Sequence, residues 1–137
     1  MFNAFERLRV AGIILTAVVI VIGVFFNVFV RLQVKDIQVL SSARSFSYGL
    51  ERYRDLRGEY PIGAPKDLRK AFTLSENGFA NGTTVLFSGD IPGSGAVTYT
   101  NATSTYTISF KIRFAWPEQG LKGRHCIVSE GYQLVCR

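Results

Sequence analysis

Cys126 and Cys136 carry the most reactive side chains of this sequence, and both stand close to its C-terminal end. In an exported domain, such a close pair of cysteines predicts one disulfide. Two free thiols or half of a metal site are the alternatives, although two cysteines and one histidine are too few for the usual zinc site. Adjacent residues of a strand point to opposite faces, so His125 and Cys126 do not form a nucleophile and base. We therefore expect a disulfide, with no catalytic residue, metal or cofactor.

The carboxylate of Glu6 stands just before a run of residues, 10–30, that contains no charged side chain. A carboxylate at the edge of a hydrocarbon layer is unfavourable by several kcal/mol unless it is paired or protonated. Glu6 is therefore a candidate for a specific pairing role. The alternative is a carboxylate that is solvated at the membrane surface or paired with Arg7 or Arg9.

Basic side chains form the other charged group with a candidate role. Its members are Arg52, Arg54, Arg57, Lys66, Arg69 and Lys70. Such a cluster contacts phosphate groups without any special motif, which makes DNA one candidate partner. A solvated face, or the complement of an acidic patch on a neighbouring subunit, fits the cluster as well. The net charge of +6 is compatible with each of these roles and identifies none of them.

The element that positions Glu6 is the uncharged run of residues 10–30. At 1.5 Å per residue, a helix of this length crosses a bilayer core of about 30 Å. The run is longer than the apolar region of a secretory signal, and no small-residue cleavage site follows it. We therefore expect a retained membrane anchor, with the N-terminus in the cytoplasm and the cysteine-bearing part outside.

The helix is expected to continue beyond the membrane and to end near Arg57, because Gly58 and Pro61 are typical of a helix end. Apolar residues recur at helical spacing in this second part, which predicts an amphipathic helix. The residues expected to face away from the apolar stripe are Lys35, Arg44, Glu51, Arg52 and Asp55. The predicted organisation is a helix over residues 1–31 and an outer domain over residues 32–137, divided into 32–57 and 58–137.

The remainder is expected to be mainly β-structure. Residues 64–72 predict a short helix, and residues 84–88 and 96–100 predict strands. Strict alternation over residues 105–114 predicts a strand with one buried face, covered by the amphipathic half of the helix. Residues 126–136 predict two short strands around a three-residue turn at Gly131. The fold class is α+β, with a long helix packed on an antiparallel sheet of about four strands.

Four features of this order resemble the type IV pilin and pseudopilin family. Glu6 follows the aromatic Phe2 by four positions at the start of the apolar helix. The segment at 53–61, with Tyr60 and Pro61 after a glycine, resembles the family's segment at the end of the long helix. The strands at 97–100 and 106–110 resemble its paired tyrosine-bearing strands, and the cysteine hairpin resembles its closing loop.

The resemblance implies a structural subunit of a type IV pilus or related filament, not an enzyme. It implies that Glu6 sets the axial register by pairing with the N-terminal ammonium of a neighbouring copy, carried by Phe2 in a processed chain. It also implies copies of the same chain, a prepilin peptidase and an assembly machinery as partners. The implied locations are the cytoplasmic membrane before assembly and the cell surface afterwards. A pseudopilin, a minor pilin, or a membrane-anchored module that binds DNA or a surface ligand remain alternatives.

Overall fold

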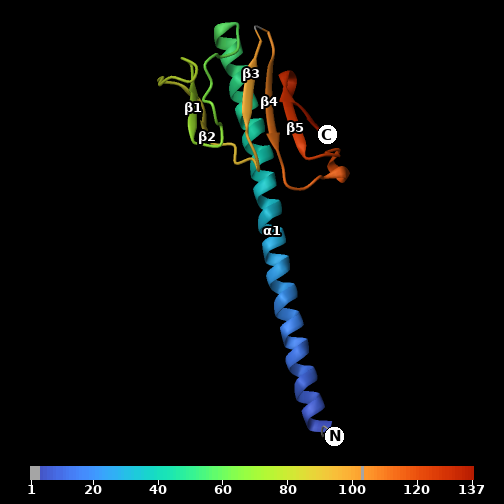
Figure 1. Cartoon of the computed structure of the whole chain (residues 1–137). Helices are drawn as coiled ribbons and strands as arrows, with labels where there is room; N and C mark the ends of the chain where they lie inside the picture. Colours follow the sequence, from blue (N-terminus) through green and yellow to red (C-terminus); the bar gives the residue numbers. More distant parts are fainter. Residues whose placement is uncertain (1–3, 103) are drawn as a thin grey trace. The chain divides into compact units, whose positions relative to one another are not determined.

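The computed structural model describes residues 4–102 and 104–137, with side chains from Glu6 onward. In this part of the chain, helix α1 (Ala4–Arg57) precedes two antiparallel sheets (Figure 1). The strands are β1 (Phe72–Ser75), β2 (Val85–Gly89), β3 (Thr98–Asn101), β4 (Tyr106–Lys111), β5 (His125–Ser129) and β6 (Gln133–Cys136), and the short 3-10 helices are η1 (Pro117–Gln119) and η2 (Glu130–Tyr132). This is the α+β class that the sequence predicts.

The chain divides into two compact units between Val34 and Lys35. Within the second unit, α1 ends at Arg57 as predicted, and Gly58 follows with a φ of 80°. The Gly58 N–H donates to the carbonyl of Arg54 at 2.7 Å, which is the usual way for a glycine to close a helix. Pro61 follows shortly, and proline cannot continue a helix.

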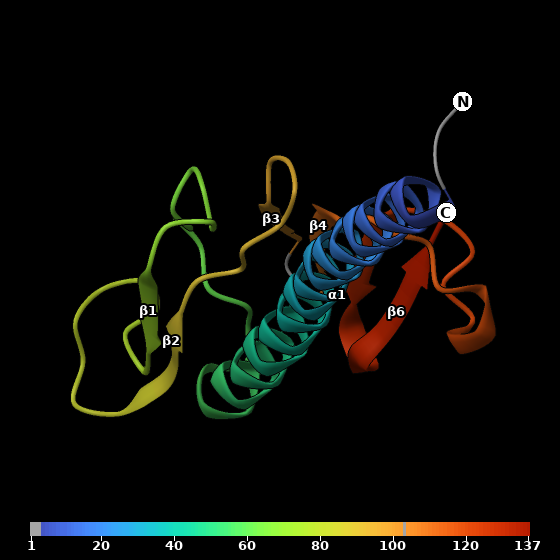
Figure 2. The same ribbon diagram turned by 90° about the horizontal axis from the view of Figure 1, so that it is seen from below.

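The larger sheet of the second unit has four strands in the order β3-β4-β5-β6. The register places Cys126 directly opposite Cys136, with η2 as the three-residue turn of that hairpin. The prediction of this hairpin is therefore confirmed. In Figure 2, β1 and β2 lie on one side of the part of α1 that belongs to the second unit, and β6 lies on the other.

Phe46 of α1 lies at the centre of the hydrophobic core of the second unit and is fully buried. The centroid of its ring lies 5.0 Å from that of Phe72, 5.3 Å from Phe87 and 5.8 Å from Tyr99. These three rings belong to β1, β2 and β3, so one helical residue contacts both sheets. Close packing continues at Gly49, where a Cβ atom would lie 3.1 Å from a backbone oxygen of β2.

Of two predictions for the segment after Pro61, one is wrong and one is confirmed. Residues 64–72 lie in the described part of the chain and form turns that lead into β1, not a helix. The Asp67 carboxylate accepts the Arg69 N–H at 3.1 Å, and such a local side-chain acceptor favours a turn over a helix. The strand predicted at 84–88 is confirmed as β2, and it pairs with β1, which was not predicted, in a sheet separate from the larger one.

Candidate assembly surface

The apolar half of α1, residues 10–30, exposes its side chains on every face. The large apolar side chains of this stretch range from 38% exposed at Phe29 to 72% exposed at Phe25. Helix α1 is therefore long and apolar enough to cross a membrane by length and composition.

The two polar side chains within this stretch both bond to the helix itself. The Thr16 hydroxyl donates to the carbonyl of Gly12 at 2.9 Å, and the Asn27 amide donates to the carbonyl of Gly23 at 3.1 Å. Hydrogen bonds of this kind reduce the free energy needed to place a polar group in hydrocarbon. The stretch is therefore suited to lipid or to a bundle of apolar helices.

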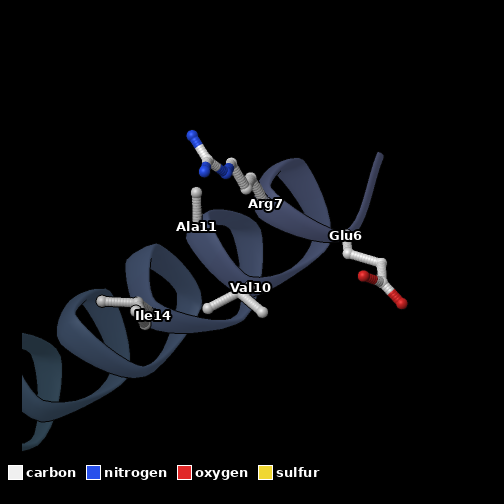
Figure 3. Close-up of a pocket in the computed structure, with 5 residues that line it drawn as sticks. All are labelled: Glu6, Arg7, Val10, Ala11 and Ile14. Atoms are coloured by element: carbon white, nitrogen blue, oxygen red, sulfur yellow. The ribbon is translucent and has the colours of Figure 1, made fainter. Parts of the chain in front are cut away.

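Glu6 is exposed in the first turns of α1. Its carboxylate points away from the Arg7 side chain, which lies toward Ala11 on another side of the helix (Figure 3). Together with Val10 and Ile14, these residues line a shallow hollow of the helix surface. Pairing between Glu6 and Arg7 is not observed among the described residues. Phe2, the other predicted assembly residue, lies outside the described residues.

The six residues of the predicted basic cluster fall into two groups. Three have partners. Arg54 forms ion pairs with Glu51 (3.0 Å) and Glu130 (2.7 Å), and Arg69 forms one with Asp67 (2.8 Å). Arg57 donates hydrogen bonds to the Glu76 carbonyl (2.8 Å) and the Asn77 side chain (3.0 Å). Arg52, Lys66 and Lys70 are exposed, and no ion pair involves them in the described part of the chain. Arg57 bonds only to neutral groups, so among the described residues of this cluster only Arg54 and Arg69 have their charge paired by a carboxylate.

Two carboxyl groups near the sheet of β1 and β2 have lowered pKa values. The hydrogen bonds that Asp67 accepts from the Arg69 side chain and backbone lower the pKa of Asp67 to about 2. Burial raises the pKa of Glu76, but hydrogen bonds from Thr83 and from the Thr84 N–H outweigh this effect and lower it. Both carboxyl groups therefore hold local turns in their ionised form.

Asp36, which was not predicted to have a specific role, fastens α1 to the segment that follows β4. Asp36 is buried, with 1% of its surface exposed. The carboxylate accepts the N–H of Arg113 at 3.0 Å and the N–H of Phe114 at 2.8 Å. Its burial could have been predicted from its position three residues before Val39, because residues at this spacing lie on the same face of a helix.

Glu51 makes a similar contact near the end of α1, although the sequence predicted that it faces solvent. It is 7% exposed, so that prediction is wrong. Its carboxylate accepts the N–H of Gly131 and the hydroxyl of Tyr60, both at 3.1 Å, and it pairs with Arg54. A charged residue is buried here because these partners replace water, which no helical pattern reveals. Burial and the nearby Glu51 raise the pKa of Tyr60.

The cysteine pair forms the predicted disulfide between Cys126 and Cys136. Cys126 is buried, whereas His125 beside it is exposed, so the two side chains face opposite sides of β5 as predicted. In residues 4–102 and 104–137, no group of three or more His, Cys, Asp or Glu side chains is placed to hold a metal ion.

Comparison with models of protein families, with curated proteins and with solved structures gives no match. The structure shows an apolar N-terminal helix followed by a disulfide-bearing sheet unit. This architecture is compatible with that of pilins.

Proposed function

We propose that this chain is a membrane-anchored structural subunit of a type IV pilus or a related filament, and that it assembles through the apolar half of α1. The observation that carries the proposal is the exposure of residues 10–30 on every face of the helix. A surface this apolar is unfavourable in water, so it needs lipid before assembly and other apolar helices afterwards.

Small residues in the apolar half support close packing between copies. A Cβ atom at Gly12 or Gly23 would meet no atom within 4 Å, so the helix surface is open at both positions. Small residues allow the backbones of neighbouring helices to approach closely, where van der Waals contact and not hydrophobicity drives association. The same surface therefore serves first in the cytoplasmic membrane and then in the filament core at the cell surface.

Glu6 is proposed to set the axial register between copies. Its carboxylate is exposed and directed away from Arg7, which leaves it accessible to a cation from another chain. By resemblance, that cation is the N-terminal ammonium of a neighbouring copy, and a prepilin peptidase and an assembly machinery act on the chain. Pairing the two charges removes the penalty of carrying a carboxylate into an apolar core.

The test replaces Glu6 in the native host and measures the amount of the chain in the membrane and in the sheared surface fraction. We expect Glu6→Gln to leave the membrane amount unchanged and to reduce the sheared amount by about tenfold, a factor that corresponds to about 1.4 kcal/mol. Glu118→Gln, which changes an exposed carboxylate of η1, is the matched control and should change neither fraction. Equal yields from the two variants would contradict the register role.

The second candidate is a pseudopilin, a minor pilin or an anchored module that binds DNA or a surface ligand. The exposure of Arg52, Lys66 and Lys70 favours it. Intact mass and N-terminal sequencing of the protein from both fractions separate the two candidates. A chain that starts at Phe2 in the sheared fraction supports the filament subunit. A chain that retains Met1 and occurs only in membranes supports the anchored module.

A further inference from the structure

Basic side chains form a row across one end of the four-stranded sheet. Lys111 of β4 pairs in register with His125 of β5, and His125 exchanges backbone hydrogen bonds with Arg137 at 2.8 and 3.1 Å. Residues that neighbour one another in this way project from the same face of a sheet. The face is the outer one, because Phe110, Cys126 and Cys136, which alternate with them, are buried.

The connection between β4 and β5 adds more basic side chains at this end. The basic end is defined here as Lys111, Arg113, Lys122, Arg124, His125 and Arg137. Residues 111–137 contain only two acidic side chains, Glu118 and Glu130, and Glu130 already pairs with Arg54. No ion pair involves the basic end within the described residues. The cations of the basic end therefore have no carboxylate partner in the described part of the chain, which favours an external anion.

Asp36 relates the basic end to the membrane anchor. Its carboxylate binds the N–H groups of Arg113 and Phe114, so the basic end lies beside residue 36 of the second unit. Asp36 stands only six positions after Val30, the last residue of the uncharged run. Whatever the arrangement of the two units, six residues span at most about 21 Å. The basic end is therefore tethered within reach of the headgroups wherever the apolar run occupies a bilayer.

We propose that the basic end docks on anionic phospholipid headgroups of the membrane that holds α1. The inference rests on the anchoring part of the proposed function and goes beyond it. Anionic lipids are the expected partner because their phosphates complement the charge of the basic end, and the short link to the apolar run keeps the basic end near them. Docking holds the outer unit against the bilayer before assembly, and transfer into a filament must break these contacts.

Trp116 provides a reporter within the chain, because it is the only tryptophan and lies between Arg113 and Lys122. The full chain is reconstituted at low protein-to-lipid ratio into vesicles of phosphatidylcholine alone or of phosphatidylcholine and phosphatidylglycerol at a ratio of about 7:3. Flotation tests anchoring, and quenching of Trp116 by acrylamide tests docking. We expect the anionic lipid to reduce the quenching constant about twofold at 50 mM NaCl, and 500 mM NaCl to restore it, because salt screens surface contacts.

Two triple variants with equal loss of charge separate docking from a general charge effect. Lys122→Gln, Arg124→Gln and Arg137→Gln change exposed members of the basic end, and this triple should lose the lipid-dependent protection. Arg52→Gln, Lys66→Gln and Lys70→Gln change exposed cations elsewhere, and this triple should keep it. Circular dichroism checks that both variants fold.

Equal quenching in the two kinds of vesicle, or equal loss of protection in the two triple variants, would overturn the docking proposal alone. Protection of Trp116 by an oligonucleotide, without an effect of anionic lipid, would assign the basic end to nucleic acid and would also overturn it. Failure of the chain to float with phosphatidylcholine vesicles would overturn the anchoring in the proposed function, and the docking proposal with it.

Discussion

Helix α1 contains two stretches with opposite surroundings. In residues 10–30 no side chain is buried, although the stretch contains no charged residue. Between Asp36 and Glu51 the helix contains both apolar and charged residues, and it buries both kinds. Burial within the chain therefore follows from a complementary partner, not from hydrophobicity alone. The apolar stretch needs partners from outside the chain, either lipid or other helices.

The carboxylates of the helix repeat this contrast. Asp36 and Glu51 are buried and bind N–H groups of the C-terminal part of the chain, whereas Glu6 is exposed at the start of the apolar stretch. Buried carboxylates with internal partners stabilise one unit. An exposed carboxylate beside hydrocarbon is instead suited to a partner in another chain.

The largest expected effect comes from removing the central ring of the packed stretch. Phe46→Ala should destabilise the second unit by about 3–5 kcal/mol, because the cavity would lie between both sheets. Phe25→Ala is the matched control in the apolar stretch, where the side chain is 72% exposed, and it should leave this stability unchanged. Urea unfolding of the full chain in detergent micelles, followed by Trp116 fluorescence, measures both. Similar losses in the two variants would contradict the contrast between the stretches.

A smaller effect is expected from the buried carboxylate Asp36. Asp36→Asn should reduce the free energy of unfolding by about 2 kcal/mol, because a neutral amide accepts the N–H groups of Arg113 and Phe114 less strongly. Glu6→Gln should leave the same free energy unchanged and affect only assembly. If Asp36→Asn has no effect on unfolding, the carboxylate does not fasten the helix to the segment after β4.

Much of this architecture could be predicted from periodicity. The helix end at Arg57, the alternating strand β4 and the hairpin that joins Cys126 to Cys136 all follow from local patterns. Strand β1 could not be predicted in this way, because it is short and its partner β2 lies ten residues further along the chain. A short strand is recognised by its partner, and a pairing across such a loop leaves no periodic signal.

The parts of the site that depend on distant partners were also beyond the sequence. Glu51 was predicted to face solvent because its burial depends on Gly131, which is far away in the chain. The basic cluster appeared uniform in the sequence, whereas Arg57 and Arg69 have local hydrogen-bond partners and Lys66 is exposed. The sequence therefore identifies the charged residues, but only the three-dimensional contacts show which of them have partners within the chain.

The smallest expected effect concerns Asp67, an ionised carboxylate in a surface turn. Its pKa of about 2 lies below the ordinary value of an unfolded chain, which is about 3.9. A carboxyl group whose pKa is lowered by folding stabilises the fold above the unfolded pKa, and this contribution disappears as pH falls through the folded value. The stabilisation by Asp67 should therefore be complete at pH 7, should decline below about pH 4 and should be mostly lost at about pH 2.

Asp67→Asn tests this expectation through the urea midpoint of the full chain in micelles at pH 7, 4 and 2. The variant should have a slightly lower midpoint than the unchanged protein at pH 7, and the difference should shrink toward pH 2, where the carboxyl group is protonated in the unfolded chain and about half protonated in the folded one. Asp90→Asn, which changes an exposed carboxylate after β2, is the control and should not alter the midpoint. A difference that is as large at pH 2 as at pH 7 would show that the side chain acts by its shape and not by its charge. In that case the ionised form of this surface carboxylate would not stabilise the second unit, in contrast to the buried carboxylates of Asp36 and Glu51.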